Sequence, residues 1–303
     1  MQLKITIFAI FFAVTQSAWG ASAGERALVW AESQRDVMLG AVMVARHRLE
    51  TAESDLAVSR NVERDISSSK DKAAQSIARE AVFVSEQGVT EAKTLLKRAS
   101  AFLSQQENTI AEVKKFIAEN NNKKALVIPV EGKFRIASSG GIAFDSKEII
   151  GSLKKGDRIE VGPGSSARVF TSGGNAEIAL SENSKLTLNH NQADDSFEGL
   201  LNEGFAQIRV ALRGKYAHKF EVRTPSAALA VRGTEFSVRA SPSKTRIEVF
   251  ESTVYVSPVQ GGEGVEVHAG EGCDVLKDGG IQPVKPLDNQ PRPNPWSNHV
   301  TPN

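Results

Sequence analysis

The chain has 303 residues and a formal net charge of +1, from 37 lysines and arginines against 36 aspartates and glutamates. This length is enough for one or two domains with a substantial core. A near-neutral charge and an aromatic content of 6% argue against nucleic-acid binding, which needs a basic surface or stacking platforms. The single cysteine, Cys273, excludes an internal disulfide and a thiolate metal cluster. We expect it to be a packed or half-buried thiol; the alternative is an intermolecular disulfide or a reactive thiol.

Residues 1–23 have the three parts of a cleaved secretory signal peptide. Lys4 supplies the positive charge, an apolar run follows from Ile5 to Val14, and two frames of small residues end at Gly20 and Ala23. The apolar run is too short to span a bilayer as an uncleaved anchor. We therefore predict export to the periplasm, or secretion, with cleavage after Gly20 or Ala23 and no stable membrane insertion afterwards.

Residues 24–124 carry a helical pattern, with apolar side chains every three or four positions and charged residues between them. This pattern predicts two or three antiparallel helices in a hairpin or small coiled coil. The polar stretch Ser59–Lys72 predicts one helix break and Gly88 predicts a second, with Thr90 at the start of the next helix. We expect this module to dock a partner or to self-associate into a homo-oligomer.

After Ala125 the period of the pattern changes to two. Short segments such as RIEV (158–161) and AQIRV (206–210) alternate between apolar and polar residues, and glycine-rich turns separate them. Many short strands about ten residues apart are typical of an all-β sandwich or roll. The whole chain is thus predicted to be α+β, with a β domain over residues 125–288 and a flexible proline-rich tail over 289–303.

The segment TPSAALAVRGTEFSVRA (224–240) contains the candidate site residues Arg232, Gly233, Thr234 and Glu235. Gly233 permits a bulge or a positive φ before the next strand. Arg232 can bind loop carbonyls or pair with Glu235, so the main interpretation is a structural clasp. The alternative is a contact between Arg232 and a ligand or partner. Glu235 is a poor candidate for catalysis, because an adjacent arginine lowers the pKa of a carboxyl group.

A hairpin is predicted directly after this corner. Phe236, Val238 and Ala240 should face the core, and the chain should turn at residues 241–244. On the opposite face, Arg239 should meet Glu248 or a neighbour across the two strands.

Motifs that carry chemistry do not occur in this sequence. The five histidines show no metal-binding spacing, and neither a G-x-S-x-G turn nor a phosphate-binding glycine loop is present. Asp194 and Asp195 are too few oxygen ligands for a calcium loop. We therefore expect no catalytic residue, no metal and no cofactor.

Five segments, in this order, resemble the FecR domain of bacterial envelope proteins. They are GSLKKGDRIEVGPGSSARVF (151–170), SENSKLTL (181–188), LNEGFAQIRV (201–210), FEVRTPSAALAVRGTEFSV (220–238) and VEVHAGEGCDVLKDGG (265–280). The resemblance implies a jelly-roll-like β domain with no known catalytic centre. Iron-signalling members of the family join a cytoplasmic anti-sigma segment to this domain through one transmembrane helix. This chain resembles them in the β domain and has the predicted signal peptide and amphipathic helices before it.

We therefore expect a non-catalytic periplasmic or secreted module that binds or scaffolds a cell-envelope protein or glycan. The alternative is a periplasmic sensor that relays occupancy of the β domain to a membrane partner, as in FecR-type regulation. A hydrolase is the third class, and it would require turnover that depends on a single carboxylate.

Overall fold

A computed structural model describes residues 22–119, 125–132, 134–137, 143–146, 150–151, 153, 156–171, 176–191, 196–210, 220–231 and 233–288. The chain divides into two compact units, which we describe separately. The helical unit spans Trp30–Ile110, and the β unit contains the strands together with the helix ends outside that range. The predicted tail and all but the last two residues of the predicted signal peptide lie outside the described residues.

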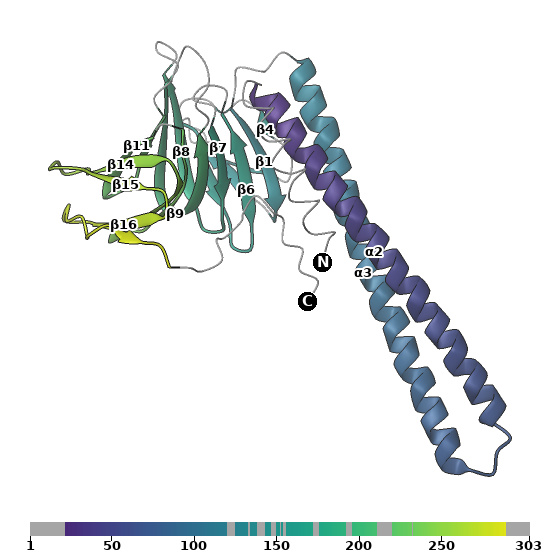
Figure 1. Ribbon diagram of the computed structural model, residues 1–303. Coiled ribbons are helices and arrows are strands. Elements are labelled where there is room, and N and C mark those ends of the chain that lie inside the picture. The colour runs from purple at the N-terminus through teal and green to yellow at the C-terminus, as the bar shows by residue number, and fades with distance from the viewer. Residues whose placement is uncertain are drawn as a thin grey trace. The chain divides into compact units, whose positions relative to one another are not determined.

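Two long helices make up the N-terminal half of the described chain (Figure 1). Helix α2 spans Ala23–Ile66 and helix α3 spans Lys72–Ala118. The chain reverses between them within the predicted break. There, Oδ1 of Asp71 accepts hydrogen bonds from the backbone N–H groups two and three residues later, at 2.9 and 3.1 Å. This side chain therefore caps the start of α3. Neither helix has a stretch long and apolar enough to cross a membrane.

The predicted second break at Gly88 is wrong, because α3 continues through it. Thr90, which was expected to begin a helix, donates its hydroxyl to the carbonyl oxygen of Glu86 at 2.9 Å, as a residue within a helix does. A glycine inside a helix costs only about 1 kcal/mol relative to alanine. Burial of the neighbouring Val89 and of the rest of the helix interface outweighs that cost.

Buried side chains recur every seven residues along both helices. Buried members of these two series include Ala31, Met38 and Ala45 in α2, and Ala78, Ala92 and Ala99 in α3. Ser59 and Ser85 continue the same series and hydrogen-bond to each other at 3.0 Å. Because most members are small, the two helix backbones can lie close together. We refer to these residues as the seam.

The β unit contains two sheets that share the long strand β9. Sheet A contains, in spatial order, β4 (Ile150–Gly151), β1 (Leu126–Glu131), β6 (Ser166–Phe170), β7 (Ala176–Leu180), β9 (Ser196–Val210), β12 (Glu235–Ala240), β13 (Lys244–Glu251), β16 (Glu271–Leu276) and β17 (Lys285–Pro286). Sheet B contains β3 (Ala143–Ser146), β2 (Phe134–Ala137), β5 (Arg158–Val161), β8 (Lys185–Asn191), β9, β10 (Phe220–Arg223), β11 (Ala227–Val231), β14 (Thr253–Pro258) and β15 (Val265–His268).

The chain passes repeatedly from one sheet to the other. After the first strand of each sheet, the spatial order follows the chain order. Among the described strands, neighbours are antiparallel except for the parallel pair β9 and β10. The α+β class is therefore confirmed, whereas the jelly-roll detail of the prediction is not.

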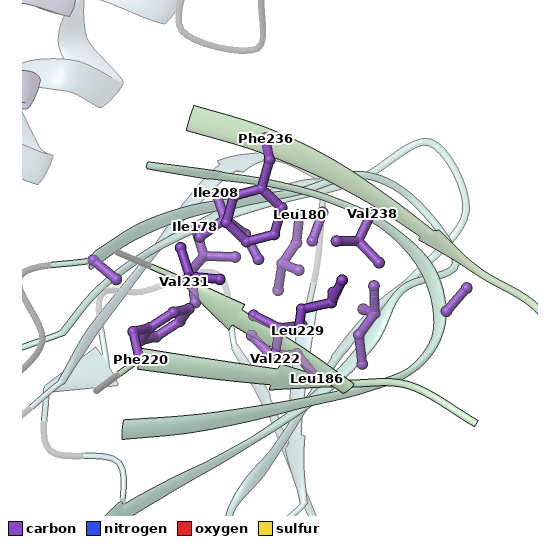
Figure 2. Packing of buried hydrophobic residues seen from close by; sticks show 14 of the residues in the cluster. Ile178, Leu180, Leu186, Ile208, Phe220, Val222, Leu229, Val231, Phe236 and Val238 are labelled. Carbon is purple, nitrogen blue, oxygen red and sulfur yellow. The ribbon is translucent and has the colours of Figure 1, made fainter. Parts of the chain in front are cut away.

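The core of the β unit lies between the two sheets (Figure 2). The labelled side chains from sheet A are Ile178, Leu180, Ile208, Phe236 and Val238, and those from sheet B are Leu186, Phe220, Val222, Leu229 and Val231. All ten are buried. The alternation of the strands then directs the residues between them, such as Gln207 and Arg209, to the outer faces of the sheets.

Strand β9 belongs to both sheets because it bends at Gly204. Its first half pairs with β8 in sheet B, and its second half pairs with β7 and β12 in sheet A. Gly204 has a φ of +102°, a conformation that residues with a Cβ rarely adopt. Directly after the bend, β9 presents Gln207 and Arg209 to the neighbouring strand β12.

Candidate functional site

The predicted corner lies between β11 and β12. Arg232 lies outside the described residues. Gly233 has a φ of +62°, which confirms the expected left-handed conformation, and the pairing with β13 shifts register at the start of β12. The carbonyl oxygen of Thr234 accepts a hydrogen bond from the backbone N–H of Val210 at 2.9 Å. The corner is thus joined to the end of β9.

Glu235 binds two side chains from β9. Its Oε2 accepts hydrogen bonds from Nε and Nη2 of Arg209 at 3.1 and 2.9 Å, and its Oε1 accepts one from Nε2 of Gln207 at 2.8 Å. The side chains of Arg209 and Glu235 are only 20% and 13% exposed. Both carboxylate oxygens are therefore engaged in a largely water-excluded setting, where charge-assisted hydrogen bonds are strong.

These partners differ from the one that the sequence indicated. Arg232 was considered as a partner of Glu235 because it is near in sequence, whereas Arg209 and Gln207 are 26 and 28 residues away. They are brought close because Arg209 lies directly opposite Glu235 in the β9–β12 register. The alternating segment AQIRV indicated that both residues share one face, but it did not indicate which strand lies beside them.

A row of alternating charge crosses sheet A at this level. Glu177 on β7 lies opposite Arg209, which in turn lies opposite Glu235.

Arg168 is almost completely buried, and burial lowers the pKa of its guanidinium to about 9, an effect that Glu177 opposes and Arg209 reinforces. Burial likewise lowers the pKa of Arg26, which donates to the carbonyl oxygen of Thr171.

This arrangement is suited to holding strands together. The carboxylate of Glu235 on β12 accepts three hydrogen bonds from Arg209 and Gln207 on β9 and so links the two strands. We call the Arg209–Glu235 pair, together with Gln207, the clasp between β9 and β12. The clasp predicted for Arg232 itself stays a prediction.

The hairpin after the corner has the predicted buried face. Phe236, Val238 and Ala240 are buried, as is Ile247 opposite them. The expected cross-strand contact is different, because Arg239 lies opposite Arg246 and its guanidinium lies over the ring of Phe205, 4.9 Å from the centroid. Glu248 lies opposite Ser237, whose hydroxyl donates to it at 3.4 Å.

Other residues with potential chemistry have ordinary surroundings. Cys273 is buried, as predicted, and burial raises the pKa of its thiol to about 11. Nδ1 of His268 lies 3.0 Å from the hydroxyl of Thr253. Within the described ranges, no three histidine, cysteine, aspartate or glutamate side chains come together as a metal site. His218, His299, Asp194 and Asp195 lie outside those ranges.

The outer face of sheet B is polar and exposed. Nε of Arg223 lies 2.7 Å from Glu221 and 2.9 Å from Glu198. Further along the sheet, Arg158 pairs with Glu160 at 2.7 Å. These side chains stand on the side of the sheet opposite the buried Val222 and Ile159. They give the β unit a charged surface that a partner can reach.

A hollow lies at the turn of the helical hairpin. It has a volume of about 330 Å³, and it is lined by Arg60, Glu63, Arg64, Ser67, Gln75 and Arg79. Three guanidinium groups against one carboxylate make it more suited to an anionic than to a cationic group. It belongs to the helical unit and is separate from the corner in the β unit.

Comparison with known proteins finds a family match within the β unit. Residues 157–255 match the family described as FecR protein. No curated protein matches the chain. Two crystal structures of a candidate anti-sigma factor from Parabacteroides distasonis, at 2.50 and 1.65 Å resolution, are similar with TM-scores of 0.38 and 0.37 and 23% identity. Each alignment covers 44% of this chain and 61% of the other, so this chain spans about three fifths of their length.

Proposed function

We propose that this chain, whose residues 157–255 form a FecR domain, is a regulatory component of the cell envelope that senses a signal and relays it to a membrane partner. The observation that carries this proposal is the family match over residues 157–255, which include strands β5 to β13 from both sheets. The resemblance to FecR proteins connects this domain with regulation. The predicted signal peptide supports a periplasmic location.

The outer face of sheet B is the proposed surface for the signal or partner. Its charged side chains are exposed, with Arg223 and Glu221 at 50% and 39%. The corresponding region of sheet A contains the largely buried Arg209–Glu235 clasp, whose polar groups are already engaged. A partner can therefore displace water and contact sheet B without breaking the internal hydrogen bonds of the clasp in sheet A. This role requires no catalysis.

A complementation experiment in the source organism tests the proposal. Deletion of the gene should change a defined set of transcripts, and the intact gene should restore them. The double variant Glu221→Arg, Arg223→Glu should be exported and folded but fail to restore the transcripts. Lys244→Glu is the matched control, because Lys244 is equally exposed but pairs with Asp274 in sheet A. An unchanged transcript profile on deletion would contradict the regulatory role.

A scaffold that binds an envelope protein or glycan is the second candidate. The exposed ion pairs of sheet B also favour this function, because a charged and accessible face is suited to polar recognition. The two candidates differ in their consequence for gene expression. Photo-crosslinking from position 221 in intact cells, combined with an unchanged transcript profile, would favour the scaffold.

A further inference from the structure

One side of the helical hairpin exposes large apolar side chains over most of its length. They are Val37, Val44, Val58 and Val62 of α2, and Ile77, Val84 and Phe102 of α3, each between 37% and 68% exposed. We call this set the valine side. Isolated exposed valines need no explanation, but a group of exposed apolar residues along one side of a hairpin marks an interaction surface.

The positions of these residues relative to the seam show that they share one side. Val58 directly precedes Ser59, and Val84 directly precedes Ser85, the seam pair that hydrogen-bonds across the helices. The residues directly after that pair, Arg60 and Glu86, form an ion pair at 2.9 Å. Since the residues that follow the seam pair meet on one side of the hairpin, those that precede it share the opposite side.

Four charged residues interrupt the valine side near its middle. Arg48 and Arg98 lie at nearly the same level along the hairpin, because Ser59 faces Ser85 and the helices run antiparallel. Asp55 and Glu91 lie together about two turns closer to the hairpin turn, roughly 10 Å away. All four are exposed. None of the four has an ion pair or hydrogen bond to another described side chain.

This pattern is complementary to a second copy of itself. We consider a two-fold axis that runs perpendicular to the helices, across both of them, at the level of Thr51. Rotation about this axis brings Arg48 and Arg98 of one copy opposite Asp55 and Glu91 of the other. The same rotation brings Val44 onto Val58, because each lies seven residues from Thr51. On α3, Val84 and Phe102 lie equally far from residue 93, which is at the level of Thr51 by the seam register. The apolar residues on one side of the axis in one copy therefore contact those on the other side of the axis in the second copy.

From this we infer that two copies of the chain associate through the valine side, with α2 against α2 and α3 against α3 in antiparallel fashion. A two-fold interface must be self-complementary, and this surface is so in both charge and hydrophobicity. Exposed apolar residues next to the seam are typical of helices that pack against further helices, as in bundles of more than two. This inference does not depend on the function proposed for the FecR domain.

The size of the surface is sufficient for a stable dimer. The valine side runs over 26 residues, from Val37 to Val62, which is about 38 Å of helix. With helix axes about 9 Å apart, a face of roughly 700 Å² becomes available on each copy. Standard stable interfaces bury about 800 Å² on each partner.

Substitution on the two sides of the hairpin tests the inference by sedimentation of the purified chain. The unsubstituted chain should sediment as a dimer, and Val58→Glu should sediment as a monomer. Met43→Glu is the matched control, because Met43 is 72% exposed on the side away from the valine side, and it should stay dimeric. Circular dichroism should show unchanged helix content in both variants. A monomeric unsubstituted chain, or equal loss in both variants, would overturn the inference.

Charge exchange tests the antiparallel register. Arg48→Glu and Asp55→Arg should each weaken self-association at least tenfold, because each places like charges opposite one another. An equimolar mixture of the two variants should dimerise again, because each altered residue then meets an opposite charge in the other copy. If the mixture stays as weak as its components, the proposed register is wrong.

A cysteine at the proposed axis gives a positional test. Residue 51 of one copy should lie beside residue 51 of the other, so Thr51→Cys should form a disulfide-linked dimer on mild oxidation. Met43→Cys is the control and should remain uncrosslinked. The native Cys273 is buried and does not compete. Equal crosslinking of the two variants would contradict the two-fold axis.

Discussion

Gly204 lies so close to Ser184 that no side chain fits between them. A Cβ on Gly204 would lie 2.3 Å from Oγ and 2.4 Å from Cα of Ser184. The hydroxyl of Ser184 also accepts a hydrogen bond from the N–H of Phe205 at 3.0 Å and donates to its carbonyl oxygen at 3.1 Å. This contact holds β9 where it passes from sheet B to sheet A, as is typical of strands that form a corner between sheets.

Gly204→Ala should destabilise the β unit by about 3 kcal/mol, because the substitution combines a positive φ with a backbone clash. Urea unfolding followed by near-UV circular dichroism measures the change. The control is Gly199→Ala in the same strand, where the nearest atom to the added Cβ would be a methyl carbon of Leu186 at 3.6 Å. Equal effects of the two substitutions would show that the corner is not constrained as described.

Glu235→Ala should lower the free energy of unfolding by about 2 kcal/mol, because it leaves the largely buried Arg209 and Gln207 without their shared acceptor. Glu221→Ala, which breaks an exposed pair with Arg223, should cost less than about 1 kcal/mol. Thermal unfolding of both variants provides the comparison. If Glu235→Ala is as stable as the native chain, the clasp interpretation fails.

Gly88→Ala should stabilise the helical unit by about 1 kcal/mol, because alanine has less freedom to lose when a helix forms. An added Cβ at Gly88 meets no other atom within 4 Å. Gly40 is also helical and equally open, so Gly40→Ala should behave in the same way. Differential scanning calorimetry checks both, and a loss of stability at position 88 would indicate that the glycine is needed for a local bend.

Cys273 should make stability depend on pH in the alkaline range. Its thiol pKa is raised from 9.0 to about 11 in the folded chain, so the folded state retains the proton where the unfolded state loses it. The contribution of the neutral thiol is present in full below pH 9 and is lost as the pH rises towards 11. The stability difference between the native chain and Cys273→Ala should therefore shrink over this window. A difference that does not change with pH would contradict the burial of the thiol.

Local features of the fold could be predicted because they depend on residues near each other in the chain. The reversal between the helices follows from the polar residues of Ser67–Asp71, and the positive φ of Gly233 follows from glycine before an alternating strand. The buried face of β12 follows from its period of two. At Gly88 the local signal was misleading, because contacts across the seam outweigh the low helix propensity of one glycine.

The partners of Glu235 depend on register and could not be found in this way. Gln207 and Arg209 lie 28 and 26 residues before Glu235 in the chain. A shift of one residue in the pairing of β9 with β12 would turn both side chains to the other face of the sheet. The crossing of β9 at Gly204 is also invisible in the sequence, because glycines occur in most turns of this domain.

By itself, the sequence of this protein determined the two classes of secondary structure, the boundary between them and the inward face of strand β12. These follow from periodicity and from backbone preferences of single residues. Only the tertiary structure decided that β9 serves both sheets, that Arg209 binds Glu235, and that the exposed valines of the two helices share one side. Such relationships are set by register and by the relative rotation of elements, which come about only when distant segments are in contact.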